Sequence, residues 1–169
     1  MMDACMVKGL DFWLDSAAES VREFAVTCLG MDRSEIRILK KESVPPKDKI
    51  GAYLALVSID DSVQIGVVSS KEGCRSITGA MLAMSEEEIE ELTRPDIIDT
   101  MGEVVNIIAG MVKSKMVNVN PDLNLGLPVF LDGQVEPLPQ QELGTIEIRI
   151  KDIDVRVIII RQRETSSSS

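Results

Sequence analysis

The stretch from Asp96 to Met116, DIIDTMGEVVNIIAGMVKSKM, constrains the fold more than any other part of the chain. At the roughly 100° per residue of an α-helix, Asp99, Glu103, Asn106 and Gly110 fall at about 0°, 40°, −20° and 20°. They form one narrow polar row. The other side is a broad apolar arc that consists of Ile97, Met101, Val104, Val105, Ile108, Met111 and Val112. The pattern predicts an amphipathic helix that packs on a core and turns its polar row outward.

The polar row on this helix has two explanations. It is either an ordinary solvated face or a surface that binds another molecule. Gly102 and Gly110 lie beside the row, although glycine destabilises a helix interior by about 1 kcal/mol relative to alanine. Glycines let another backbone or side chain come close, which suits docking, and they equally suit tight packing against a neighbouring helix. The residue pattern leaves both explanations open.

Further helices and strands are predicted before and after this central helix. Gly30 is placed to end the first helix, Ser70 to cap the second, and Pro95 to be the first residue of the third. Residues 85–92 carry a capping-box pattern for a short acidic turn. Helices are predicted at residues 11–29, 71–84 and 96–116, and strands at residues 36–40, 52–59, 63–68, 128–132, 145–151 and 155–161. The order α-β-β-β-α-α-β-β-β predicts an α+β fold, with long helices packed on a largely antiparallel β-sheet.

The last two predicted strands differ in their expected burial. Isoleucine alternates with charged residues over Ile146–Ile150, which predicts one wet face. The run Val157–Ile160 is apolar throughout, so we expect it to be buried on both sides or covered by a partner. A turn at Asp152–Asp154 is expected to pair the two strands. Residues 118–127, upstream of these strands, are predicted to form a loop.

The composition excludes several classes of function. The chain has 18 basic and 28 acidic residues, a formal charge of −10, which disfavours binding to nucleic acid or an anionic membrane. It has no histidine, so nucleophile pairs of serine or cysteine with histidine are excluded and the common zinc ligand sets are disfavoured. Aromatic residues make up 3%, too few for a base-stacking platform. Cys5, Cys28 and Cys74 lack metal-binding or redox spacing and are expected to be small buried hydrophobes.

The hydropathy pattern bears on location and domain organisation. Charged residues interrupt the early apolar positions, so we expect no signal peptide, and no apolar run approaches the ~20 residues that span a bilayer. We therefore expect a soluble, cytoplasmic protein. An apolar content of 44% over 169 residues is enough for one core, so residues 1–162 are expected to form a single domain. The Ser-rich tail at residues 163–169 is expected to be disordered.

The polar row also resembles a known motif. The CheC/CheX/FliY chemotaxis phosphatases carry the pattern Asp/Ser-x-x-x-Glu-x-x-Asn, followed about twenty residues later by a proline. Asp99, Glu103, Asn106 and Pro128 are similar to it in order and spacing. The first helix has no second Glu-x-x-Asn, so the single copy resembles CheX rather than the two-copy CheC proteins. The resemblance spans residues 5–161, with the segments MLAMSEEEIEEL and LGLPVFLDG among its parts.

This resemblance implies a CheC/CheX-like fold, an activity and a partner. CheX-like proteins are implied to be homodimers joined through their sheets that hydrolyse the aspartyl-phosphate of a CheY-like response-regulator receiver domain. By this resemblance, Asn106 would orient the attacking water and Glu103 would pair with the receiver's active-site lysine. Asp99, Gly102 and Gly110 would bind the partner. No cofactor or metal of its own is implied, since the receiver would hold the Mg²⁺.

Alternatives remain for the edges of the site and for the function. Asp99 would orient the interface, hold a basic residue of the receiver, or be a surface charge near the helix start. Lys113 and Ser114 flank the row, where they would touch the partner only at its edge. The alternative function is a non-catalytic receiver-binding or flagellar-switch-like scaffold on the same fold. A third is an unrelated acidic structural protein.

Overall fold

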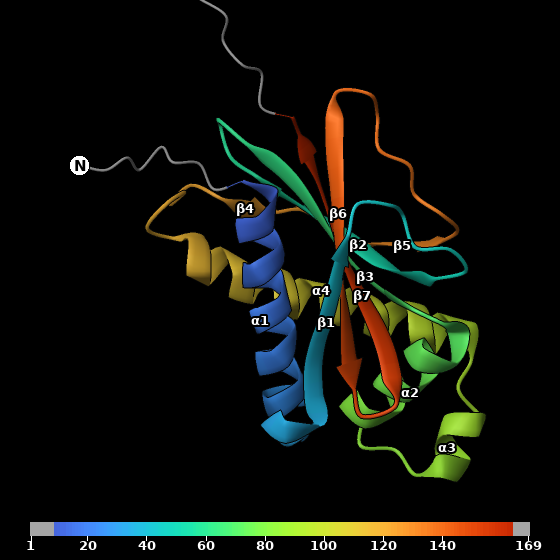
Figure 1. Ribbon diagram of the computed structural model, residues 1–169. Coiled ribbons are helices and arrows are strands. Elements are labelled where there is room, and N and C mark those ends of the chain that lie inside the picture. The colour runs from blue at the N-terminus through green and yellow to red at the C-terminus, as the bar shows by residue number, and fades with distance from the viewer. Residues whose placement is uncertain (1–8, 164–169) are drawn as a thin grey trace, which may run out of the picture.

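A seven-stranded antiparallel sheet forms the centre of the computed structural model, which describes residues 9–163 (Figure 1). The strand order is β1-β6-β7-β3-β2-β4, and β5 pairs with β2 next to β4. The strands are β1 (Ile36–Glu42), β2 (Ile50–Val57), β3 (Ser62–Ser69), β4 (Asn124–Leu125), β5 (Val129–Asp132), β6 (Gln141–Ile150) and β7 (Ile153–Gln162). The predicted antiparallel arrangement is confirmed.

The long helices cover the main apolar core of the sheet. The helices are α1 (Leu10–Cys28), α2 (Lys71–Met81), α3 (Glu86–Glu90) and α4 (Arg94–Met116), of which α3 is short. A 3₁₀ turn, η1, lies at Arg33–Glu35. α1 packs mainly on β6 and β7, whereas α4 packs mainly on β2 and also contacts α1 (Figure 1). One apolar cluster joins these helices to the inner face of the sheet. The predicted α+β class with helices on a sheet is therefore confirmed.

The helix ends follow local sequence signals. Gly30 has a φ of +67° directly after the last residues of α1, a conformation that glycine adopts without steric cost. The Ser70 side chain accepts a hydrogen bond from Gly73 N–H, and Ser85 forms the expected capping box with Glu88. At α4, however, Thr93 is the N-cap, so Pro95 is the second helical residue rather than the first. The helix therefore begins at Arg94, one residue before the predicted first residue Pro95.

The face of the sheet opposite the helices, here called the outer face, is partly covered by apolar side chains, although a solvent-exposed face was expected. Tyr53, Val68, Leu143, Ile158 and Ile160 form a second apolar cluster there, and Val135 of the β5–β6 connection packs on it. The final apolar run is thus buried on both sides within this chain, and the first of the two expectations for it is confirmed. The sequence could not show this cover because the connection is distant in the chain.

The charged residues on the outer face neutralise one another across strands. Arg156 on β7 lies 3.5 Å from Glu147 on β6 and 3.7 Å from Glu42 on β1. Only 13% of the Glu147 side chain and 17% of the Arg156 side chain are exposed. Alternation in one strand correctly predicted which side chains leave the core. The wet-face expectation is wrong for Glu147, which Arg156 of the neighbouring strand covers, whereas the Arg149 side chain keeps 35% of its surface exposed.

Several predicted boundaries moved when the strands paired. The β6–β7 turn is Lys151–Asp152, with Lys151 at a φ of +55°, so Ile153 and Asp154 belong to β7 rather than to the turn. β6 begins at Gln141, four residues before the predicted start, because it pairs with β7 along its whole length. The expected loop at residues 118–127 contains the short strand β4. Pairing with a distant strand decides each of these boundaries.

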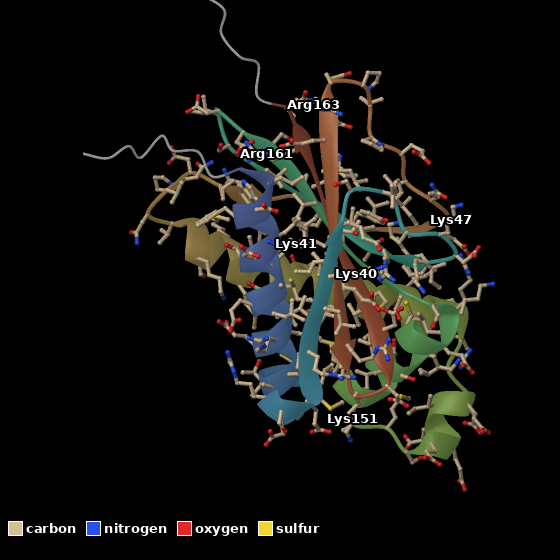
Figure 2. All side chains as sticks on the ribbon, viewed as in Figure 1. Lys40, Lys41, Lys47, Lys151, Arg161 and Arg163 are labelled. Atoms are coloured by element: carbon tan, nitrogen blue, oxygen red, sulfur yellow. The ribbon has the colours of Figure 1, made fainter. Side chains whose placement is uncertain are left out.

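Two consecutive lysines on edge strand β1 bind different neighbours. The Lys41 Nζ reaches α1, where it lies 2.7 Å from Asp15 and 3.5 Å from Asp11 (Figure 2). The Lys40 Nζ lies 2.8 Å from Glu42 on the same strand. The β1–β6 register shifts between Ile38 and Lys41, a bulge of the kind that edge strands often carry.

Within residues 9–163, no helix is both long and apolar enough to cross a membrane. Of the predicted buried cysteines, Cys74 is fully buried and Cys28 is half-buried, whereas Cys5 lies outside the described residues. The predicted disordered tail at residues 163–169 also lies outside them, except for Arg163, whose backbone N–H donates to Gln140 O.

The burial of Cys74 predicts that its thiol reacts slowly with alkylating reagents. Burial raises the pKa of Cys74 to about 12, so almost no reactive thiolate forms near neutral pH. In a Cys5→Ser variant at pH 8, a maleimide is expected to modify Cys28 within minutes and Cys74 only after unfolding, as read by peptide mass spectrometry. A further Cys74→Ala change should leave the labelling of the folded protein unaltered. Equal rates at the two thiols would contradict the assignment.

Candidate functional site

The polar row of α4 faces outward, as its spacing predicts. Asp99, Glu103 and Asn106 are exposed, and Gly102 and Gly110 are half-buried. The apolar arc is in the core: Ile97, Met101, Val104, Val105, Ile108 and Val112 are buried, and Met111 packs against them. The helix is held at its start by a capping box, in which Thr93 and Asp96 bond each other's backbone. The Thr93 N–H and hydroxyl both donate to the Asp96 carboxylate and so lower its pKa.

An open cleft of about 410 Å³ runs along the polar row. The wall on α4 consists of Ile98, Asp99, Gly102, Glu103 and Asn106. The structure therefore brings the acidic and amide side chains of the motif to one cleft. Because residues three and four apart lie on adjacent turns of a helix, one bound molecule can touch several of them together.

The opposite wall comes from the segment that joins β4 to β5 and from β5 itself. The joining segment contributes Gly126, Leu127 and Pro128, and β5 contributes Phe130. A Cβ placed on Gly102 would lie 3.5 Å from the Pro128 Cβ, so the two walls meet at these residues. The proline of the sequence motif thus lies beside its helix, although it is more than twenty residues from Glu103 in the chain.

The polar side chains of the cleft are free to bind another molecule. Among the described residues, none forms a hydrogen bond or an ion pair with the side chains of Asp99, Glu103 or Asn106. Two nearby charges are already paired: the Arg94 Nη2 lies 3.3 Å from Asp132, and its guanidinium lies 5.7 Å from the centroid of the Phe130 ring. The cleft therefore offers two unpaired carboxylates, which suit a cation, and one carboxamide, which can both donate and accept a hydrogen bond.

The two glycines of the polar row have different surroundings. Gly102 lines the cleft, whereas Gly110 does not, and a Cβ on Gly110 would meet no atom of residues 9–163 within 4 Å. The alternative that these glycines serve tight packing on a neighbouring helix is therefore wrong. Beyond the row, Ser114 Oγ donates to the backbone oxygen of Gly110 at 3.1 Å, and Lys113 is half-buried.

Most of the second wall was not predicted from the sequence. Pro128 was predicted as part of the motif, whereas Gly126, Leu127 and Phe130 were not, and neither was Ile98 on α4. A leucine between a glycine and a proline was the available signal, because such a residue is poorly placed to enter a regular strand. Only the pairing of this segment with β2 brings it beside α4.

Over residues 9–163, His, Cys, Asp and Glu side chains form no group of three or more that could hold a metal ion. The cleft itself contributes only the two carboxylates Asp99 and Glu103.

Known structures share this fold at low sequence identity. A CheC-like superfamily protein from Shewanella sp. PV-4 matches with a TM-score of 0.74 at 14% identity, over 92% of this chain and 100% of that chain. A chain of the CheX-CheY-BeF3-Mg²⁺ complex from Borrelia burgdorferi matches with 0.65 at 18%, over 93% and 99%. The FliM middle domain from H. pylori matches with 0.56 at 9%, over 92% and 94%.

The family of this chain is shown by a match to a protein-family model, not by these distant structures. No curated protein matches the chain. The model of the chemotaxis phosphatase CheX matches residues 53–148, more than half of the 169 residues. This match contains most of β2, all of β3 and α4, and both walls of the cleft. The chain therefore belongs to the CheX family of chemotaxis phosphatases.

Proposed function

We propose that this protein hydrolyses the aspartyl-phosphate of a CheY-like receiver domain and so ends a two-component signal. The observation that carries the proposal is the pair Glu103 and Asn106, which are exposed, unpaired among the described residues, and on one wall of a cleft. The family and the CheX-CheY complex among its structural neighbours support a receiver as the partner. This chain would supply orientation rather than a nucleophile.

The reaction needs one water in line with the bond that breaks. An acyl phosphate is already reactive, so positioning the water accounts for much of the possible acceleration. The water oxygen forms a bond to phosphorus while the bond from phosphorus to the aspartate oxygen breaks. The aspartate leaves as a carboxylate, and the protons of the water pass to phosphate and solvent. Asn106 would orient this water, because its carboxamide both donates and accepts hydrogen bonds.

Glu103 would set the position of the receiver on the helix. It lies one turn before Asn106, so a lysine that pairs with its carboxylate would place the phosphoryl group near the amide. A charge-assisted hydrogen bond of this kind is short and directional. Asp99 and Gly102 would extend the same contact surface within the cleft, and Gly110, with open space above it, would allow close approach further along the helix.

The Mg²⁺ of the reaction would belong to the receiver, where it would neutralise charge on the phosphoryl oxygens. The role of this chain is then complementary: two carboxylates and an amide approach a cationic and phosphorylated site on the partner. No cofactor of its own is part of the proposal.

A phosphoryl-loss assay tests the proposal. A CheY-like receiver is phosphorylated, mixed with the protein, and followed for loss of the phosphoryl group. Faster loss than in buffer alone is the expected result. If the receiver binds but its phosphoryl group decays at the unassisted rate, the scaffold alternative stands instead. The likeness of the fold to a FliM middle domain is the observation that favours this alternative. An unrelated acidic structural protein is excluded by the family match.

We also propose a homodimer joined through the sheets, as the family resemblance implies. The final apolar strand has no free edge to pair with a second copy, because β7 lies between β6 and β3. β1 is an edge strand that pairs only with β6 among the described strands, so its outer backbone groups are available. Sedimentation equilibrium at micromolar concentration should give twice the chain mass of 18.6 kDa. A monomer under these conditions would exclude the dimer.

A further inference from the structure

The wall of the cleft opposite α4 contains a bulge. β4 and β5 both pair with β2, with Leu125 opposite Leu56 and Val129 opposite Tyr53. The two β2 residues between these pairs face the three residues Gly126–Pro128. One residue is therefore extra on the outer strand. Bulges occur often beside functional sites because they redirect a side chain without disturbing the rest of the sheet.

The backbone of this bulge is held on both sides. The Gly126 N–H donates to Ala55 O at 2.7 Å, and a Cβ on Gly126 would lie 3.2 Å from that oxygen. On the other side, Pro128 has a restricted φ and contacts the position of Gly102 on α4. Leu127 lies between these two anchored residues, so its direction is set by the fold before any partner binds.

Leu127 is apolar yet almost fully exposed. Its exposed fraction is 86%, compared with 1% for Leu123 just upstream. Burying a leucine is among the larger favourable terms that one side chain contributes, so exposing it in a fixed position leaves that term available for binding. Single exposed apolar residues are common, but this one lines the same cleft as Glu103 and Asn106.

We propose that Leu127 is the apolar anchor of receiver docking: it buries itself against the phosphorylated receiver while α4 engages the receiver's active site. This inference rests on the proposed function and adds a partner-binding residue outside the helix motif. A molecule that reaches Asn106 enters a cleft whose opposite wall includes Leu127. Apolar contacts around a polar centre exclude water from it, which strengthens the charged contacts inside.

The charge of the cleft favours a receiver over a second copy of this chain. In a symmetric contact through the cleft, Asp99 and Glu103 of one copy would approach the same carboxylates of the other. A chain with a formal charge of −10 offers little to offset that repulsion. A partner that presents a lysine beside an apolar surface meets both walls of the cleft.

The test measures binding and chemistry separately for Leu127→Ser. A CheY-like receiver held in its active form by Mg²⁺ and beryllium fluoride is titrated by fluorescence anisotropy, and its phosphorylated form is used for single-turnover decay. The Kd is expected to rise on the order of tenfold, while the decay rate at saturation changes less than twofold. Leu127→Met should bind nearly as tightly as the parent chain.

The matched control is Ile59→Ser, because Ile59 is 93% exposed in the β2–β3 turn and does not line the cleft. Its Kd should not change. An unchanged Kd for Leu127→Ser, an equal loss in Ile59→Ser, or a loss confined to the rate at saturation would each overturn the anchor. Binding without acceleration by the parent chain would reject the catalytic proposal alone. Absence of binding would reject both.

Discussion

Replacing Asn106 with alanine is expected to reduce the acceleration of phosphoryl loss by about 10²-fold or more while the receiver still binds. One oriented hydrogen-bonding group in a reaction centre commonly contributes this much. Asn106 is exposed and unpaired among the described residues, so its loss removes no core contact and the protein should remain folded. Single-turnover decay of the phosphorylated receiver at saturating protein measures the rate, and anisotropy measures the binding.

The control for Asn106→Ala is Asn118→Ala, because Asn118 is an exposed asparagine in the turn after α4 and does not line the cleft. It should behave as the parent chain does. A decay rate for Asn106→Ala that stays within a few-fold of the parent rate would remove the water-orienting role. A matching loss of binding would instead make Asn106 a docking residue.

Replacing Glu103 with alanine is expected to weaken receiver binding by about tenfold or more and to slow turnover as well. The carboxylate is proposed to hold a receiver lysine, and removing one member of a close charged pair leaves the other unpaired at the interface. Because a charge pair is screened by salt, the affinity of the parent chain should fall with ionic strength more steeply than that of Glu103→Gln. Titrations at several salt concentrations measure this difference.

The control for Glu103 is Glu86→Gln, which removes an exposed acidic charge from the short helix α3, away from the cleft. It should change the affinity only slightly. A double-mutant cycle with the receiver's lysine separates a direct pair from a general charge effect, since only contacting residues give a coupling energy. Full activity of Glu103→Ala would refute the pairing role.

The helix that carries the site could be predicted because its signals are local. The apolar arc, the Glu103 and Asn106 spacing and the polar direction of the row all follow from 3.6 residues per turn, and each is present in the structure. Helix caps were predicted for the same reason, since the cap side chain accepts a hydrogen bond from a backbone N–H only three residues later. The first residue of α4 was predicted wrongly because Thr93, not the residue before Pro95, is the N-cap of the helix.

The opposite wall of the cleft could not be predicted in this way. Residues 118–127 were expected to be a loop, yet Asn124 and Leu125 pair with β2, and the bulge after them turns Leu127 into the cleft. This outcome depends on hydrogen bonds to a strand some seventy residues away, for which the local sequence has no periodic signal. The burial of the charged side chains on the outer sheet face could not be predicted for a similar reason. Arg156 pairs with glutamates on two other strands, β1 and β6.

The sequence by itself determined the amphipathic helix, the α+β class, the family and the polar side chains proposed to act on the receiver. The helix and its polar side chains depend on periodicity and spacing within about one helix length, which a linear chain displays directly. The α+β class follows from the order of such segments, and the family follows from the motif resemblance and the match of the family model. The tertiary structure alone decided that the polar row faces a cleft, that Gly110 lies outside it, and that Leu127 closes its other side. Strand register is a long-range property, because it is set when distant segments pair, and this register built the second half of the site.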